Sequence, residues 1–241
     1  MEWIKNLQIP LCKSQRIPIK TLIEQLDITS SDKRLVEKHL AVIKLVSILD
    51  ETTIRIRAYK DENYSYQSIY VLFIELKTDT SIVTLSNIVH SAFPEPTLLI
   101  YRLKSSYYIS TSSKRINKVD TEKSVIEEVT LEKINPNINK SYLSIKELTG
   151  SNLKEYYENI VSWVYKLKLF QITNIYPSGE VDFKAIIKDY DKLTQDIDKL
   201  KERYKTASML AEKMRIDDEI YDKEKLQKIM KSNLKGDQVN G

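Results

Sequence analysis

The sequence is poor in cysteine, glycine and histidine, and each shortage removes a class of function. Cys12 is the only cysteine, which excludes a disulfide framework or a cysteine zinc site within one chain. None of the four glycines lies between an expected strand and a helix, so a P-loop or classical dinucleotide-binding loop is absent. The two histidines, His39 and His90, give no signature for a metal cluster or for a Ser/His/Asp or Cys/His catalytic arrangement.

Long apolar runs are missing as well. Nowhere do about 18 apolar residues follow one another, and the start MEWIKNLQIP has no apolar core, so we expect neither a membrane span nor a signal peptide. The single cysteine points to a reducing compartment, and we predict a cytoplasmic protein. The 38 basic and 34 acidic residues give a formal charge of +4, a nearly balanced surface that is compatible with nucleic acid without implying it.

A strand–helix–strand pattern is the clearest fold signal. Residues 69–74 form a continuous apolar run, which predicts a strand covered on both faces. Thr78 and Asp79 are expected caps for a helix over 81–92, and residues 97–103 predict a second buried strand. One helix joining two buried strands favours a right-handed crossover. We therefore expect an α/β (α+β) fold, with a mixed central sheet and flanking helices, followed by a C-terminal helical or coiled-coil tail.

Three elements are expected before this pattern, the first of which is a short helix over 19–26 that follows an irregular arm. Ser31 and Asp32 precede apolar residues at helical spacing, which predicts one long helix ending near Leu49. Residues 52–59 alternate isoleucine with arginine, which predicts a half-exposed strand.

The elements expected after it are a hairpin, an edge strand and helices. Ser105 and Ser106 predict a turn into a short strand over 107–111, followed by a polar connection. The remaining predictions are an edge strand over 125–134, a short helix over 145–148, an amphipathic helix over 153–167 with Trp163 in the core, and a turn at 177–179.

A heptad pattern of apolar residues runs from Ile186 to Met214 and breaks at Asp217 and Asp218. It divides the chain into an α/β domain with a helical end, 1–180, and a tail, 181–235, that is either one long helix or a helical hairpin. The pattern needs a partner: the domain itself, a second copy of the chain or another protein. The expected partner seam consists of Tyr190, Leu193, Ile197, Leu200 and Tyr204.

A metal-dependent nuclease is the one enzymatic hypothesis that the residues allow. Glu75 and Lys77 end a buried strand that precedes a helix and another buried strand, which is similar to the PD-(D/E)xK nuclease pattern. In that pattern an acid of the preceding strand and the Glu hold Mg²⁺ while the Lys assists the attacking water. Asp61 is the least secure member of this set. The alternative interpretation is an ion pair at a strand end, which requires no cofactor.

Basic and aromatic residues alternate along the expected hairpin. Cations at such positions would contact phosphates, and tyrosines would stack on bases. The alternative is a tyrosine-rich sheet face with a charged rim. The candidate nucleic-acid contacts are Arg102, Lys104, Tyr107, Lys114 and Arg115.

The order of these segments resembles a known family. The stretch from Leu35 to Ile56, the segments IYVLFIELK and AFPEPTLLIYRL, the helix GSNLKEYYENIV and the charged tail together are similar to the bacterial proteins catalogued as domain of unknown function 4391. The resemblance implies a prokaryotic protein encoded near helicases, DNA methyltransferases and restriction-type genes in anti-phage islands, and it implies no established activity. Ser208, Asp217 and Asp218 depart from the more regular tail of the family.

Two hypotheses follow. The first, which we favour, is an accessory subunit of a DNA-acting system, anti-phage or restriction-associated, that docks a protein partner or a second copy through its C-terminal helix and contacts DNA through the hairpin. The second is a divergent metal-dependent nuclease.

Overall fold

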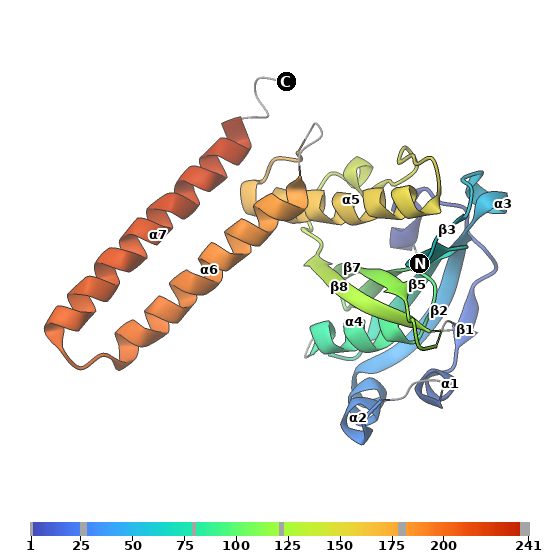
Figure 1. Cartoon of the computed structure of the whole chain (residues 1–241), viewed down its shortest axis with the longest axis horizontal. Coiled ribbons are helices and arrows are strands. Elements are labelled where there is room, and N and C mark those ends of the chain that lie inside the picture. Colours follow the sequence, from blue (N-terminus) through green and yellow to red (C-terminus); the bar gives the residue numbers. More distant parts are fainter. Residues whose placement is uncertain (1, 25–27, 79–80, 121–122, 178–181, 237–241) are drawn as a thin grey trace. The chain divides into compact units, whose positions relative to one another are not determined.

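The computed structural model describes the chain except for residues 1, 25–27, 79–80, 121–122, 178–181 and 237–241 (Figure 1). It divides into two compact units, Met1–Val164 and Tyr165–Gly241, and helix α5 (Leu153–Thr173) begins in the first and ends in the second. The expected cap Asp79 and the last two residues of the expected turn at 177–179 lie outside the described residues. Among the helices that are described, none has the length and apolar character to cross a bilayer.

A six-stranded mixed sheet forms the first unit, with the strand order β1–β2–β5–β6–β7–β8. Strands β5 and β6 pair in parallel, and the other neighbouring pairs are antiparallel. Strands β3 and β4 form a separate small hairpin. The strands are β1 (Gln15–Ile17), β2 (Leu40–Leu49), β3 (Tyr59–Lys60), β4 (Ser65–Tyr66), β5 (Ile69–Leu76), β6 (Thr97–Leu103), β7 (Ser106–Ile116) and β8 (Ser124–Lys133). The helices before α5 are η1 (Glu2–Leu7), α1 (Ile19–Glu24), α2 (Ser30–His39), α3 (Glu51–Ile54), α4 (Ile82–Ser91) and η2 (Lys140–Leu143).

The predicted strand–helix–strand pattern is confirmed as β5, α4 and β6. Strand β5 is paired with β2 and β6 along its two edges, and its apolar run is buried except for the partly exposed Tyr70. Helix α4 is preceded by Ser81, which has a φ of 65°, and it ends at Ser91, three residues before Pro94. The mixed sheet with flanking helices confirms the predicted fold class.

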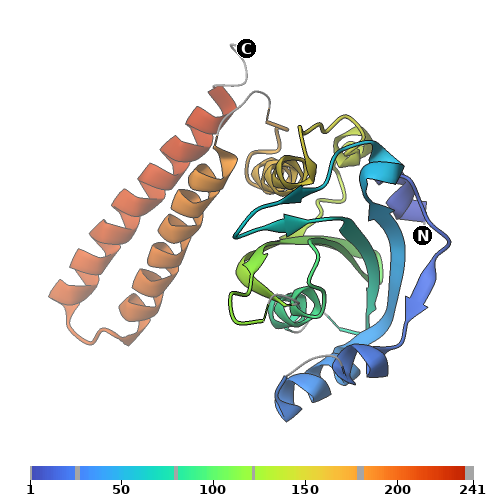
Figure 2. The same ribbon diagram turned by 45° about the vertical axis from the view of Figure 1, so that its right-hand side comes forward.

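Helices cover both faces of this sheet, with α4 on one face and the first part of α5 on the other (Figures 1 and 2). On the α4 face, Ile74, Leu99 and Tyr101 pack with apolar residues of that helix. On the α5 face, the hydroxyl of Tyr157 donates to the Thr97 carbonyl at 2.8 Å and accepts from a backbone N–H of β7 at 2.9 Å. A buried tyrosine thereby fixes α5 to the centre of the sheet.

The long helix predicted up to Leu49 is wrong in its second half. Helix α2 is capped by Thr29, whose hydroxyl accepts from the Asp32 N–H, and it passes at Leu40 directly into strand β2. β2 is paired on both sides and its register shifts twice along β5. Its apolar side chains therefore point to both faces at irregular spacing, which imitates the period of a helix.

The strand predicted over 52–59 is also wrong, because this segment contains helix α3. The carboxylate of Asp50 accepts from the backbone N–H groups of Thr52 and Thr53, and the Thr53 hydroxyl accepts in turn from the Asp50 N–H. Arg55, with a φ of 59°, ends the helix after a single turn. This capping box is stronger than the local alternation of isoleucine and arginine.

The hairpin predicted after β6 is confirmed, but its turn is at Lys104 and Ser105 and not at Ser105 and Ser106, and β7 begins at Ser106 and is longer than expected. Lys114 and Arg115 therefore lie within the sheet and not in a polar connection. The edge strand is confirmed as β8, and the helix with a buried Trp163 is confirmed as α5. Residues 145–148 form a turn, whereas the short helix of this region is η2.

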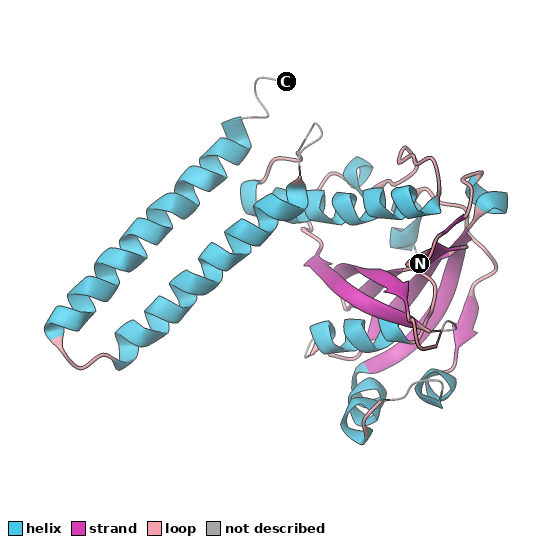
Figure 3. Ribbon diagram, viewed as in Figure 1, coloured by secondary structure: helices cyan, strands magenta, loops and turns pink. Residues whose placement is uncertain are grey.

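The second unit continues from the end of α5 into a hairpin of α6 (Phe183–Thr206) and α7 (Leu210–Gly236) (Figure 3). The helices join at Ala207–Met209, so the heptad pattern is interrupted before Met214 and not at Asp217. Cross-helix contacts hold the hairpin antiparallel: Lys201 pairs with Glu224 at 2.8 Å, and Gln227 donates to Thr194 at 2.7 Å. Coiled-coil packing against a second chain stays a prediction.

Candidate nucleic-acid interface

The residues of the nuclease hypothesis lie at opposite ends of strand β5. Asp61 belongs to the β3–β4 hairpin, where its carboxylate accepts from the Tyr59 hydroxyl at 2.6 Å and from the backbone N–H groups of Asn63 and Tyr64. That hairpin leads into the start of β5, whereas Glu75 stands near its end. At about 3.3 Å per residue, the strand separates the two by roughly 20 Å. The structure therefore does not bring Asp61 to Glu75.

Glu75 and Lys77 have other partners. The Glu75 carboxylate accepts from Arg102 at 2.9 Å, and Lys77 donates to the backbone carbonyl of Glu37 at 2.7 Å. Within the described parts of the chain, no group of three or more His, Cys, Asp or Glu side chains is placed to hold a metal ion. The geometry matches the alternative interpretation, an ion pair at the strand end.

Lys114, a predicted nucleic-acid contact, is buried with 4% of its surface exposed. Its ammonium group donates to the backbone carbonyls of His90 at 2.7 Å, Phe93 at 2.7 Å and Glu95 at 2.8 Å. These carbonyls belong to the end of α4 and the turn after it. Burial lowers the pKa of Lys114 to about 7, against the opposing effect of the Glu95 carboxylate. Lys114 therefore ties α4 to the sheet with all three donors of its ammonium group.

The imidazole of His90 lies near Lys114, and each of its two ring nitrogens contacts a side-chain hydroxyl. Its Nδ1 is 2.5 Å from the Thr97 hydroxyl, and its Nε2 is 2.9 Å from the hydroxyl of Ser110. A serine next to an imidazole is the arrangement of a nucleophile and its base. However, His90 and Ser110 are both fully buried, and burial holds the pKa of His90 well below its ordinary value. Both side chains are closed off from solvent, and their hydrogen bonds join the end of α4 to β6 and β7.

The other predicted contacts lie at the two ends of the β6–β7–β8 strands. Arg115 is at the far end of β7, 3.8 Å from the Glu127 carboxylate. Arg102 is opposite Tyr107 in the register of β6 and β7, and its guanidinium, paired with Glu75, lies 5.7 Å from the centre of the Phe73 ring. Arg102 and Tyr107 therefore share one face at the turn end of the hairpin, whereas Arg115 does not belong to this group.

The turn end carries an exposed lysine and a stacked aromatic pair. Lys104 is exposed and has a φ of 52°, a left-handed conformation that costs a non-glycine residue about 1 kcal/mol. The rings of Trp3 and Tyr107 stack with their centres 4.9 Å apart and their planes within 12°. Both rings are partly exposed. η1 thus places a second aromatic ring beside the hairpin.

A pocket of about 390 Å³ opens next to this pair. Its walls come from η1, the β6–β7 turn, the end of β8 and η2. Its charged lining residues are Lys133 and Lys140, and no carboxylate lines it. Lys133 is opposite Tyr108 in the register of β7 and β8, and its ammonium group lies 5.9 Å from the centre of that ring, on the other face of β7 from Tyr107. We call Trp3, Lys104, Tyr107, Lys133 and Lys140 the aromatic–lysine surface.

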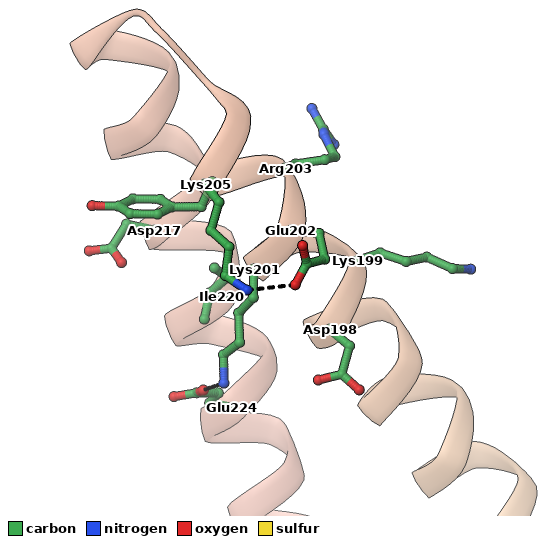
Figure 4. Close-up of a pocket in the computed structure, with 10 residues that line it drawn as sticks. Asp198, Lys199, Lys201, Glu202, Arg203, Lys205, Asp217, Ile220 and Glu224 are labelled. Atoms are coloured by element: carbon green, nitrogen blue, oxygen red, sulfur yellow. Dashed lines mark hydrogen bonds and ion pairs between the residues drawn. The ribbon is translucent and has the colours of Figure 1, made fainter. Parts of the chain in front are cut away.

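A second hollow, along α6 and α7, has a different character (Figure 4). Its lining contains equal numbers of basic and acidic side chains. Several compensate one another: Lys201 pairs with Glu224 at 2.8 Å, and Lys205 pairs with Glu202 at 2.7 Å. This hollow therefore favours neither an anion nor a cation.

The packing of α6 in the hairpin buries three residues of the expected partner seam and leaves the other two at least partly exposed. Leu193, Ile197 and Leu200 are buried in the folded chain, whereas Tyr190 is partly exposed and Tyr204 is 39% exposed. The apolar centre of the seam is therefore already covered, and it offers no continuous stripe to a partner.

Sequence reasoning found Lys104 and Tyr107 but missed Trp3, Lys133 and Lys140. Trp3 is separated from Tyr107 by most of the first unit, so only the tertiary fold brings the rings together. Lys133 is the last residue of β8 and Lys140 is the first residue of η2. No local motif marks any of the three.

Comparisons with known proteins give a family and no activity. No curated protein and no solved structure matches the chain. The model of the family described as domain of unknown function (DUF4391) matches residues 12–226. This match covers most of both units and confirms the resemblance seen in the sequence. The chain therefore belongs to the domain of unknown function 4391 family.

Proposed function

We propose that this protein is an accessory subunit of a DNA-acting system and binds nucleic acid through the aromatic–lysine surface. The observation that carries the proposal is the stacked Trp3–Tyr107 pair beside a pocket whose charged lining residues are lysines only. An anti-phage or restriction-associated setting follows from the family resemblance alone. The cytoplasmic location and the protein partner likewise stay predictions.

Charge and stacking both favour a nucleic acid as the ligand. Lysines that contact phosphates release counterions, which drives binding of any sequence. Exposed aromatic rings add stacking energy with bases of any identity. No carboxylate lines the pocket. Glu75 is next to Arg102 in the register of the sheet, as Arg102 is next to Tyr107, and the charge of Glu75 is compensated by Arg102. A small phosphate-bearing ligand would use the lysines, but an aromatic pair is characteristic of base recognition.

A protein partner would have to use the outer side of the α6–α7 hairpin. Leu193 and Leu200 are buried, but Met214 and Tyr221 of α7 are 62% and 68% exposed. Residues 207–209, where the helices join, add the exposed Met209. This support is weaker than that for nucleic acid, since exposed apolar side chains on a helix do not identify a partner.

Fluorescence anisotropy with labelled DNA tests the proposal directly. We expect the double variant Lys133→Ala/Lys140→Ala to bind less tightly than the wild type. The slope of log affinity against log salt concentration should fall by about one for each lysine removed. The matched control is Lys60→Ala/Lys118→Ala, because both lysines are exposed and lie at the other end of the sheet. An equal loss of DNA affinity in the two double variants would show non-specific electrostatic attraction and would reject the aromatic–lysine surface as the binding site.

A further inference from the structure

We infer that the pocket beside the Trp3–Tyr107 pair takes one unpaired nucleotide, with its base against the aromatic pair, its phosphate at Lys140, and Lys133 as a second cation beside Tyr108. This inference rests on the proposed function and names its substrate class: single-stranded or locally unpaired nucleic acid, and not duplex. DNA and RNA share the base and the phosphate, so the chemistry applies to both.

The volume of the pocket fits a single nucleotide. Small-molecule pockets span about 300–1,000 Å³. At about 390 Å³ this pocket is near the lower limit, which suits a single nucleotide and is too small for a stacked base pair or a longer strand. Its floor includes the apolar residues Ile134, Ile138 and Leu143, all buried. An apolar floor with an aromatic wall favours a flat ring over a free phosphate.

The polar rim of the pocket has unused hydrogen-bonding groups. Asn6, Ser105 and Ser106 line the pocket. None of their side chains forms a hydrogen bond with any residue that the structure describes. Asn135, also in the lining, uses its Oδ1 to accept from the Asn137 N–H at 2.9 Å, which leaves its amide N–H groups as donors. Carboxamides and hydroxyls are the groups that read the edge of a base.

A base within a duplex cannot reach the groups that line this pocket. In a duplex, neighbouring base pairs cover the faces of each base, and the partner strand occupies its Watson–Crick edge. A base can meet both the aromatic pair and the carboxamide of Asn6 only if it is unpaired or has left the stack. A duplex would reach the lysines through its phosphates alone. The pocket therefore predicts a preference that surface charge cannot produce.

The preference is tested with four labelled oligonucleotides of the same length: single-stranded DNA, single-stranded RNA, the DNA duplex, and single-stranded DNA with its central bases removed. We expect the intact single strands to bind at least about fivefold more tightly than the duplex and the abasic strand, from stacking of one base. Tight binding of only one of the two intact strands would identify DNA or RNA as the source of the nucleotide.

Tryptophan emission provides a second readout. Trp163 is buried and donates its indole N–H to the Tyr142 carbonyl at 2.8 Å, so a stacked base can quench only Trp3. We expect quenching by the intact single strands, none by the abasic strand, and loss of the quenching in Trp3→Phe with binding retained. Variants Tyr107→Leu and Asn6→Ala should lose the single-strand preference, whereas Tyr221→Leu, on the exposed side of α7, should keep it.

Failure of the inference and failure of the proposed function are distinguishable. If all four oligonucleotides bind equally and Lys133→Ala/Lys140→Ala weakens each of them, the surface binds phosphates and the nucleotide pocket is rejected. If none of them binds to the folded wild-type protein, both proposals are rejected. Circular dichroism of each variant establishes that it is folded before its affinity is interpreted.

Discussion

The two ends of strand β7 use the same residue type in opposite ways. At the turn end, Lys104 is exposed and its ammonium group faces water. At the far end, Lys114 is buried, and three backbone carbonyls accept from its ammonium group. An ammonium group has three donors, so Lys114 has none left for a ligand. A lysine in a basic, aromatic segment can therefore bind a ligand only where the fold leaves its donors free.

The same contrast holds for the neighbouring aromatic and hydroxyl groups. Near Lys104, the aromatic ring of Tyr107 is partly exposed and the hydroxyls of Ser105 and Ser106 are unused. Near Lys114, Ser110 is bonded to His90 in the interior. The turn end is therefore available for recognition, and the far end stabilises the packing of α4 on the sheet.

Replacing Lys114 should have the largest effect on stability. Lys114→Met keeps the length of the side chain but leaves three backbone carbonyls without their donor, and we expect the free energy of unfolding to fall by about 3 kcal/mol. Urea denaturation followed by circular dichroism measures the change. The control is Lys118→Met, an exposed site where we expect a change within about 0.5 kcal/mol. Equal effects at the two sites would show that the buried contacts contribute nothing.

The contribution of Lys114 to the free energy of unfolding should also depend on pH. Burial lowers the pKa of Lys114 from an ordinary value of 10.5 to about 7, while His90 and Glu95 lie beside it. Below pH 7 both the folded and the unfolded chain carry the proton, whereas between about 7 and 10.5 only the unfolded chain does. Unfolding therefore takes up a proton in this window, and stability should rise with pH.

The measurement is the free energy of unfolding of the wild type minus that of Lys114→Met, at pH 7 and at pH 10. Burial lowers the pKa of His90 and raises that of Glu95, and both residues are present in the wild type and in the variant. We expect the difference to increase by about one kcal/mol or more. A constant difference would show that the three carbonyls keep Lys114 charged in the folded chain throughout.

The sequence is informative where one local pattern determines the structure. The β5–α4–β6 unit could be predicted because a two-sided apolar run, a helical stripe and two prolines all agree. β2 was missed because strands buried on both faces with register shifts lose the period of two. α3 was missed although Asp50 and Thr53 have the spacing of a capping box. The alternation of isoleucine and arginine in the same segment favours a strand, but the capping box determines the structure.

The candidate site could be predicted only in part. Lys104 and Tyr107 follow from the hairpin itself, since a turn residue and its neighbour are exposed in most hairpins. Lys114 could not be placed, because the polar segment before it is buried through hydrogen bonds to α4 that no local pattern reveals. Trp3 joins the site through a contact between distant parts of the chain.

Lys104→Gly should separate binding from stability at the turn end. Glycine adopts the left-handed region freely, so we expect the free energy of unfolding to rise by up to about 1 kcal/mol. Affinity for DNA should fall at the same time, because the variant loses one phosphate contact and its salt slope decreases by about one. Thermal denaturation and anisotropy on one preparation give both values. A gain in stability without any loss of affinity would remove Lys104 from the aromatic–lysine surface.

Arg115→Ala should have the smallest effect and marks the limit of that surface. Arg115 is partly exposed and 3.8 Å from the Glu127 carboxylate, a surface pair that contributes about 0.5 kcal/mol or less. Because Arg115 is at the far end of β7, its loss should leave DNA affinity and salt slope unchanged. Arg102→Ala is the informative companion, since Arg102 shares a face with Tyr107 but its charge is compensated by Glu75. A fall in affinity for Arg115→Ala as large as that for Lys133→Ala/Lys140→Ala would extend the interface along the whole strand and would end the distinction between its two ends.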